Sequence, residues 1–448
     1  MPRLSKFSYA KDEQLTDAPH GHVLSNIGVW SADGEWITYD VRSDPAGAIF
    51  DGTRIEQVNV RTREVRVLYE SARGAKCGVA TCSPVDDRVV FICGPENPTA
   101  EWHYAPNRRR GVIVSPSKPG EALNLDARDL TPPYTPGALR GGTHLHVFSP
   151  DGKWVSFTYE DVPLERFKSA GPDHDLNQRN VGVSVRDRPV RVPRTHARNH
   201  DGEYFSVLVT KTWTYPTPRS DQISRACEEA WVGDDGYTTA NGARQKRAIA
   251  FQGEVLTARG QAISEVFIVD VPDDVNLAGA GPLEGTPTRL PAPPNQTVQR
   301  RLTHTAERRY PGLQGPRHWV RSAPDGSRIA FLMRDDAGVV QLWTVFPIGD
   351  APPVQVTRNA TDFASAFSWS PDARFIAHAM DNSIFVTDVA TGEGTRLTPR
   401  SPDQTAPRPE ACVFSPDGGA VAYVRRVPDS AEFWNQIFIV RLGGLQGF

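Results

Sequence analysis

The chain has 448 residues, with 37 glycines, 38 prolines and only three methionines. Such a composition is typical of a protein rich in turns and strands rather than of a helical bundle. A formal net charge of −3 argues against nucleic acid or another polyanion as a partner of the whole surface.

Membrane and secretory signals are missing from the sequence. The longest apolar runs, such as 436–440, are far shorter than the roughly 20 residues that a helix needs to cross a bilayer. Residues 1–10 lack the apolar segment of a signal peptide. The five cysteines are an odd number without C-x-x-C spacing. We therefore expect buried, reduced thiols and a cytoplasmic location.

A short motif recurs along the chain and predicts the fold. Each copy has an anchor residue, then Ser-Pro-Asp-Gly or a variant of this turn, then a strand of alternating polarity. Third and fourth strands follow several copies, and four antiparallel strands per repeat make a propeller blade. The sequence thus predicts one all-β domain over 1–448, a seven-bladed β-propeller. Its anchors are Trp30, Cys82, Phe148, Arg198, Ser322, Trp369 and Phe414, with the copy at Arg198 the weakest.

The N-terminal segment predicts how the ring closes. Gln14-Leu15-Thr16 has the pattern that ends a fourth strand, yet it precedes the first anchor. A strand with no blade before it should pair with the last blade and cover its open edge. We expect residues 5–17 to complete the blade that begins near Phe414.

Spacing between anchors is regular only in the last third of the chain. It is 47 and then 45 residues from Ser322 onward, but 52, 66, 50 and 124 residues before that. The excess falls in polar stretches rich in proline and glycine, at about 97–142, 211–247 and 271–298. We expect these insertions to crown one face as functional loops. Within the second insertion, Arg225–Trp231 is predicted to form a short helix.

Histidines gather at equivalent places in the repeat. Residues four and two positions before each anchor should lie on one side of an innermost strand, facing the central channel. Imidazoles and a carboxylate there suit a divalent transition metal such as Mn, Zn or Fe. A metal-free polar pocket and a plain wet channel are the alternatives, and a slip of one residue would turn the side chains away. The candidate ligands are His144, His146, His196, His318 and Glu410.

Further polar groups are expected near the same face. His103 lies in the segment 94–104, which combines aromatic rings with carboxylates, as in sugar sites and also in ordinary ordered loops. Arg140 and Arg317 each lie close to a candidate ligand. The segment 186–198 holds five arginines. Guanidinium groups can bind a carboxylate, sulfate or phosphate in a bidentate manner, although solvated surface arginines are the commoner case.

Several segments carry a resemblance to known families. The Ser-Pro-Asp-Gly repeats resemble the TolB-type, PD40-like propeller repeat. More closely, the chain resembles the YidR-like family of uncharacterised bacterial proteins, which implies the propeller fold but no activity. The segments that carry this likeness are 94–98, 102–104, 133–137, 140–150, 310–312 and 316–321.

A more distant resemblance is to the oligogalacturonate lyases. It is limited to His144, His146 and His318, each just ahead of a turn of the repeat. The resemblance implies a manganese ion in the central channel and β-elimination on uronate sugars. The glutamine ligand of that family and its catalytic histidine and arginine are not matched here.

Two hypotheses follow. In the first, the protein is a metal-dependent lyase for a small acidic oligosaccharide. The metal would bind the uronate carboxylate, His103 or His196 would remove the C5 proton, and Arg140 or Arg317 would hold the substrate. In the second, it is a non-catalytic, TolB-like propeller that binds a protein or a small ligand. Motifs of other enzymes, such as G-x-S-x-G, the P-loop and H-E-x-x-H, do not occur.

Overall fold

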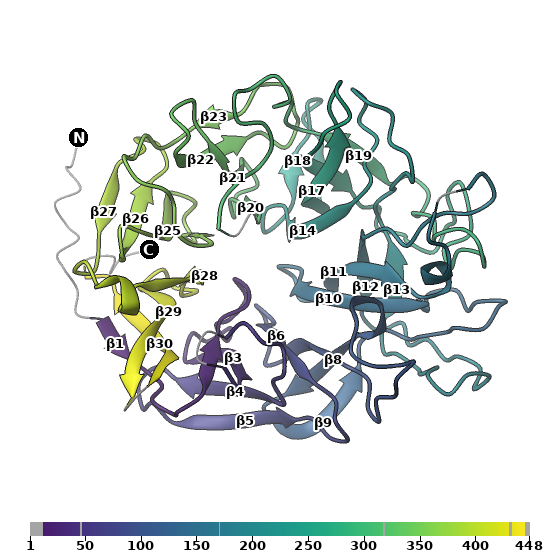
Figure 1. Cartoon of the computed structure of the whole chain (residues 1–448), viewed down its shortest axis with the longest axis horizontal. Helices are drawn as coiled ribbons and strands as arrows, with labels where there is room; N and C mark the ends of the chain where they lie inside the picture. The colour runs from purple at the N-terminus through teal and green to yellow at the C-terminus, as the bar shows by residue number, and fades with distance from the viewer. Residues whose placement is uncertain (1–11, 45–46, 170, 317–318, 430–431, 444–448) are drawn as a thin grey trace.

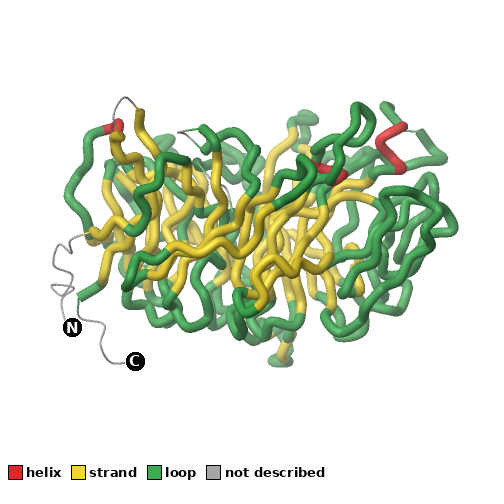
Figure 2. The backbone as a smooth tube through the Cα atoms, turned by 90° about the horizontal axis from the view of Figure 1, so that it is seen from below, coloured by secondary structure: helices red, strands yellow, loops and turns green. Residues whose placement is uncertain are grey.

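A computed structural model describes residues 12–44, 47–169, 171–316, 319–429 and 432–443. Seven four-stranded antiparallel sheets are arranged around a central axis, as the sequence predicted (Figure 1). Seen from the side, the strands form the middle of a thick disc with loops on both faces (Figure 2). Short 3₁₀ turns are the helical elements of the described chain: η1 (Pro106–Arg108), η2 (Pro163–Arg166) and η3 (Asp403–Thr405).

The first three blades follow one another along the chain, each starting at the central axis. Blade 1 comprises β2 (Gly21–Val23), β3 (Trp36–Arg42), β4 (Arg54–Asn59) and β5 (Val65–Glu70). Blade 2 comprises β6 (Cys77–Cys82), β7 (Val89–Cys93), β8 (Arg110–Ser115) and β9 (Lys118–Asn124). Blade 3 comprises β10 (Gly141–Phe148), β11 (Trp154–Asp161), β12 (Asn180–Val185) and β13 (Phe205–Leu208).

The remaining blades complete the ring. Blade 4 comprises β14 (Ala226–Trp231), β17 (Ala248–Leu256), β18 (Ala262–Asp270) and β19 (Val298–Arg301), with a small hairpin of β15 (Tyr237–Thr238) and β16 (Arg244–Gln245). Blade 5 comprises β20 (Arg321–Ser322), β21 (Ile329–Arg334), β22 (Val340–Val345) and β23 (Val354–Gln355). Blade 6 comprises β24 (Ser368–Trp369), β25 (Phe375–Met380), β26 (Ser383–Asp388) and β27 (Gly394–Arg396). Blade 7 comprises β28 (Pro407–Phe414), β29 (Ala420–Asp429), β30 (Glu432–Arg441) and β1 (Asp12–Gln14).

The N-terminal strand closes the ring, as predicted. Asp12, Glu13 and Gln14 pair antiparallel with Val440, Ile439 and Phe438 of β30. The carboxylate of Asp12 also accepts hydrogen bonds from the side chains of two β29 residues, a hydroxyl at 2.6 Å and a guanidinium at 2.7 Å. The part of the predicted segment before residue 12 lies outside the described residues.

The Ser-Pro-Asp-Gly turn is stabilised by its own side chains. Ser149 Oγ donates to Asp151 Oδ1 at 2.6 Å and accepts from the main-chain N–H of Trp154 at 3.0 Å. The same pair of contacts recurs in the turns that begin at Ser31, Ser370 and Ser415. Each turn thereby starts its second strand in the same register, which explains why the motif marks the repeat.

Anchor tryptophans join neighbouring blades in a repeated contact. Trp30 Nε1 donates to Val413 O of the preceding blade at 3.2 Å, and Trp369 Nε1 donates to Arg321 O at 3.0 Å. Trp231 Nε1 makes the equivalent bond to Val147 O at 3.0 Å. Trp231 therefore occupies the anchor position of blade 4.

The predicted fourth anchor is wrong. The strand after Arg198 is β13, which pairs with β12 as the outer strand of blade 3. The true anchor is Trp231, followed by the degenerate turn Val-Gly-Asp-Asp-Gly. Arg225–Trp231 was predicted to be a helix, but residues 226–231 form strand β14. The pattern misled because adjacent polar glutamates suited a helix, whereas pairing with β17 and burial against blade 3 decide the conformation.

Two of the predicted insertions contain regular strands. The stretch 97–142 holds β8 and β9, and 211–247 holds β14 with the small hairpin. The stretch 271–298 is a true loop and is tied to blade 3 through Arg140. This guanidinium donates to Asp161 Oδ2 at 2.7 Å and to the main-chain carbonyls of Thr286 and Arg289. Both members of the Arg140–Asp161 ion pair are fully buried.

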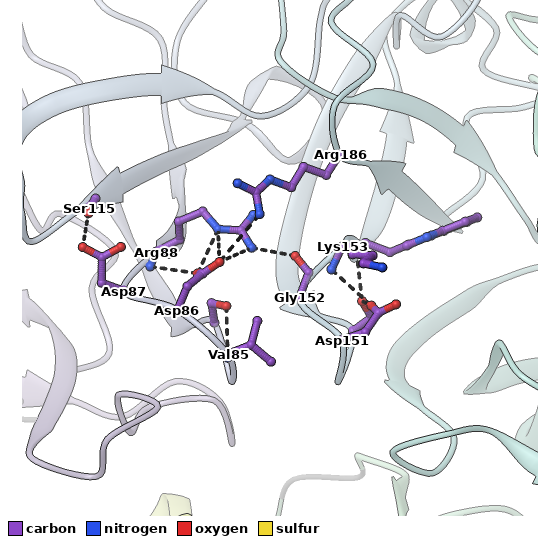
Figure 3. A network of polar contacts seen from close by, with 12 residues as sticks. Val85, Asp86, Asp87, Arg88, Ser115, Asp151, Gly152, Lys153 and Arg186 are labelled. Carbon is purple, nitrogen blue, oxygen red and sulfur yellow. Dashed lines mark hydrogen bonds and ion pairs between the residues drawn. The ribbon is translucent and has the colours of Figure 1, made fainter.

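Blades 2 and 3 are also joined on the face that carries the turns (Figure 3). Arg88 Nη2 donates to Asp86 Oδ2 and to Gly152 O, both at 2.6 Å, and Arg186 lies 3.7 Å from the same carboxylate. Apolar side chains fill the spaces between blades, in clusters that each draw on neighbouring sheets. All five cysteines are buried and unpaired, as expected.

Candidate functional site

The main cavity of the propeller is its central channel. It has a volume of about 590 Å³ and is lined by residues from all seven innermost segments. Small-molecule sites commonly enclose roughly 300–1,000 Å³, so this cavity suits a small ligand. Four aromatic anchors contribute to its wall: Phe148, Trp231, Trp369 and Phe414.

Three innermost strands carry the same β-bulge. Val79 in β6, Leu145 in β10 and Glu228 in β14 each lie three positions before an anchor. Their φ angles are 58°, 59° and 57°, and the pairing register shifts at each of them. Because a bulge adds one residue to a strand, it redirects the side chains that follow. The residues of these strands cannot be assigned to the channel by simple alternation.

Glu229 lies directly after the bulge of β14 and lines the channel cavity. Its side chain is fully buried, and Oε2 accepts a hydrogen bond from Thr158 Oγ1 at 2.6 Å. Oε1 has no hydrogen-bond partner among the described residues. Burial raises the pKa of Glu229 to about 8, so the carboxyl is largely protonated at neutral pH.

Arg321 approaches from β20 and reaches across the channel. It is 3% exposed, and Nη2 lies 3.4 Å from Asn26 Oδ1 of blade 1. The guanidinium carbon stands 4.6 Å from the ring centroid of Trp319. Burial lowers the pKa of Arg321 to about 10, which still leaves it charged at neutral pH.

Three buried polar groups from different blades thus meet in one cavity. Asn26 Nδ2 and Arg321 Nε, like Glu229 Oε1, have no hydrogen-bond partner in the described part of the chain. A buried polar atom without a partner costs about 1–3 kcal/mol, which a bound polar molecule can recover. The arrangement offers a cation, amide donors and a protonated carboxyl, beside aromatic walls.

His144 and His146 do not share one side of β10. The bulge at Leu145 separates them: His144 pairs with Thr158, whose side chain reaches toward Glu229 in blade 4. His146 instead packs toward blade 2, where a Cβ on Gly111 would come within 2.7 Å of its Nε2. His146 is fully buried, and burial lowers its pKa to about 3. His144 is half-buried, and its pKa is also lowered by burial and by Arg109.

The other predicted site residues are scattered. His196 and His103 are exposed and do not line the channel cavity; His196 instead lies against Trp102, with ring centroids 6.2 Å apart. Glu410 is 8% exposed on β28, and its carboxylate lies 3.8 Å from the guanidinium of Arg408. Arg140 is fully buried in the ion pair that holds the 271–298 loop.

Arg317 and His318 lie outside the described residues. Within the described ranges, no group of three or more His, Cys, Asp or Glu side chains is placed to hold a metal ion. The predicted ligands that lie in the described ranges, namely His144, His146, His196 and Glu410, are therefore not brought together.

Sequence reasoning missed Glu229 and Arg321 as site residues. Glu229 was assigned to a helix, and Arg321 was passed over because it lies one position before its anchor. The available signal was Trp231-Val-Gly-Asp-Asp-Gly, a degenerate copy of the repeat. Placing the anchor there would have put Glu229 two positions before it, where channel residues were sought.

One solved structure agrees with the fold. A structure of a puromycin-hydrolysing peptidase from Mycobacterium tuberculosis is 13% identical and aligns with a TM-score of 0.51. The alignment covers 96% of this chain but 55% of that one, so this chain spans about half the length of the peptidase. An acylaminoacyl peptidase from Pyrococcus horikoshii is 7% identical with a TM-score of 0.48, over 95% of this chain and 52% of that one. Among the described residues, no helix has the length and apolar character needed to cross a membrane.

The family is established by sequence. Residues 76–200 match the model of a family described as a protein of unknown function (DUF3748). The chain is also 47% identical over 426 residues to the Escherichia coli (strain K12) uncharacterized protein YidR, covering 94% of this chain and 96% of that protein. With such identity along nearly the whole length, the chain belongs to the YidR family, and its fold is a seven-bladed β-propeller.

Proposed function

We propose that the protein binds a small hydroxylated carboxylic acid, with an acidic sugar as the first candidate, in its central channel. The observation that carries this proposal is the meeting of Asn26, Glu229 and Arg321 in the cavity with unused hydrogen-bonding atoms. The guanidinium of Arg321 suits a ligand carboxylate. The protonated carboxyl of Glu229 and the amide of Asn26 suit ligand hydroxyls.

The aromatic anchors support the sugar class. The indole rings of Trp231 and Trp369 line the same cavity. Aromatic faces pack against the apolar faces of sugar rings while polar groups bind the hydroxyls, as in most small-molecule sites. A neutral Glu229 also matters, because an ionised carboxylate in the cavity would repel the acid.

Binding of galacturonate, with galactose as the neutral control, tests this proposal by titration calorimetry. We expect galacturonate to bind more tightly than galactose, and Arg321→Gln to weaken galacturonate binding about 10- to 100-fold, the loss of one charge-assisted interaction. Arg321→Lys should retain part of the affinity. Arg358→Gln, at an exposed arginine outside the cavity, should match the wild type.

The pH dependence gives a second readout. Binding should weaken as the pH rises through about 8, where Glu229 ionises, and Glu229→Gln should remove that weakening. Failure of every uronate tested to bind, or equal binding to the wild type and both Arg321 variants, would overturn the proposal. A protein partner, the alternative role of the propeller, would then be the next candidate.

The metal-dependent lyase remains a finer prediction about the same channel. It needs one transition metal, manganese first, held by the candidate histidines and Glu410, which the described residues do not bring together. Elemental analysis of the purified wild type and of His144→Ala tests it directly. About one equivalent in the wild type, lost in the folded variant, together with ultraviolet absorbance from an unsaturated uronate product, is the result that the lyase requires.

A further inference from the structure

A second cavity lies away from the channel, between the segment 94–104 and the turn 197–200. Its volume is about 280 Å³. It is framed by the outer part of blade 2 and the segment that leads into β13. We call it the basic pocket, after its principal lining residues: Glu96, Trp102, Arg110, Arg128, Arg198 and His200.

The positive charge of the basic pocket is only partly balanced. Arg110 lies 3.3 Å from the carboxylate of Glu96. Arg198 donates to two main-chain carbonyls, at 2.7 and 3.0 Å, and Arg128 donates to two others. Neither Arg128 nor Arg198 forms an ion pair with a carboxylate among the described residues. Among the lining residues, three guanidinium groups are set against one carboxylate, and Asp126, which does not line the pocket, also stabilises the charge of Arg128.

The positive charge of Arg128 is unusual because the side chain is buried. Its side chain is only 3% exposed, and burial lowers its pKa to about 10. Asp126 in the core supplies part of a counter-charge to Arg128, although burial raises the pKa of Asp126. Burying a charge without a full partner is costly, and a bound anion would offset that cost.

The remaining groups of the pocket fit an oxyanion. His200 is adjacent to Arg128 and Arg110, which together with burial keep its pKa well below the ordinary value. Its Nε2 is buried and has no hydrogen-bond partner in the described chain. Trp102 forms one wall, with the guanidinium carbons of Arg128 and Arg198 at 5.8 and 5.9 Å from its ring centroid. The indole therefore contacts two of the three guanidinium groups of the pocket.

We propose that the basic pocket binds the phosphate group of a small phosphorylated molecule. A phosphate monoester carries about −1.5 to −2 charges at neutral pH and several strong acceptor oxygens, which suits a pocket whose lining has more guanidinium groups than carboxylates. Arg110 and Arg198 would donate from two sides, and Arg128 would supply charge from the buried end. This site shares no lining residue with the channel cavity, so it does not depend on the function proposed for the channel.

Inorganic phosphate is the probe for this site. Phosphorus NMR line broadening and titration calorimetry of the full chain should show one equivalent bound. Arg198→Gln should weaken phosphate binding at least tenfold, while Arg198→Lys should retain most of it. Arg188→Gln is the matched control, because Arg188 is an exposed arginine of the same basic segment but does not line the pocket.

Arg110→Gln provides a second variant in case Arg198→Gln does not fold, since Arg198 also holds the carbonyls of residues 96 and 97. Loss of phosphate binding in either folded variant, with normal binding in Arg188→Gln, supports the site. The proposal is overturned if both pocket variants bind phosphate as tightly as the wild type, if Arg188→Gln loses as much affinity as they do, or if the wild type does not bind phosphate. Galacturonate binding in the channel should be unchanged by all three substitutions.

Discussion

Blades 5 to 7 and blades 2 to 4 are built from the same repeat but differ in what they bury. In the first group the anchors are 47 and 45 residues apart, whereas the anchors at Cys82, Phe148 and Trp231 are separated by 66 and 83. In blades 5 to 7, the buried charged side chains among the described residues are Arg321 and Glu410. The chain between Cys82 and Trp231 buries many more: Arg109, Asp126, Arg128, Asp129, Arg140, Asp161 and Glu229.

This contrast separates what holds the propeller together from what equips it to bind. The regular blades pair their strands and fill the spaces between sheets with apolar side chains, which needs no ions. Buried charges add little net stability, because desolvation offsets their attraction. Their concentration in the irregular half therefore indicates sites and loop attachments, and both proposed sites draw on that half.

The largest loss in the free energy of unfolding should come from breaking the buried Arg140–Asp161 ion pair of blade 3. Arg140→Gln leaves Asp161 buried with its principal partner gone and releases the carbonyls of the 271–298 loop. We expect a loss of about 3–5 kcal/mol in the free energy of unfolding, measured by urea denaturation.

Its counterpart is the exposed pair between Arg441 and Glu13 of blade 7. Arg441→Gln should cost no more than about 1 kcal/mol. Equal losses in the two variants would mean that the buried pair has no special role and that the two regions do not differ as described.

The second prediction concerns the pH dependence of stability, for which the pKa difference of Glu229 sets an upper limit. The pKa of Glu229 is about 8 in the folded protein and has the ordinary value of 4.5 in the unfolded chain, so between these values only the folded chain holds the proton. The free energy of unfolding should therefore fall as the pH rises from about 5 to 8, by about 1.4 kcal/mol for each unit of pKa difference at most.

Glu229→Gln should flatten that slope, and thermal unfolding at several pH values measures it. Glu393→Gln, at an exposed turn of blade 6, serves as the control and should keep the slope of the wild type. An unchanged slope in Glu229→Gln would show that Glu229 is ionised in the folded protein.

A modest effect is expected where the two regions are alike. Trp231→Phe and Trp369→Phe each remove one hydrogen bond to a carbonyl of the preceding blade, and each should cost about 1–2 kcal/mol. Because the contacts lie in separate blades, the costs should add in the double variant. A much larger cost for Trp231 would show that the irregular half depends more on this contact than the regular half does.

Much of the fold could be predicted from the sequence because its signals are local. The turn that begins at Ser149 or Ser415 needs only neighbouring side chains, and the same is true of the alternating strand that follows. The pairing of the strand around Gln14 could be predicted because a fourth strand without its own blade can pair only with the open edge of the last blade. Blade 4 could not, since its anchor Trp231 lacks the serine and proline of the other copies.

The candidate site was less predictable. The pattern before each anchor drew attention to the innermost strands, but it assumed regular alternation. The bulges at Leu145 and Glu228 break that alternation, and the bulge at Leu145 turns His144 and His146 to different faces. A bulge has no clear sequence signature here, because a leucine, a valine and a glutamate adopt the same left-handed conformation.

The sequence by itself determined a closed seven-bladed propeller, because the repeated turn and the unpaired first strand can each be recognised from a few consecutive residues. The tertiary structure alone decided which side chains meet. Asn26, Glu229 and Arg321 come from blades 1, 4 and 5, and their separation of almost 300 residues along the chain hides their proximity. Ring closure and the bulge of β14 bring these buried side chains into one cavity, and burial shifts the pKa values of Glu229 and Arg321.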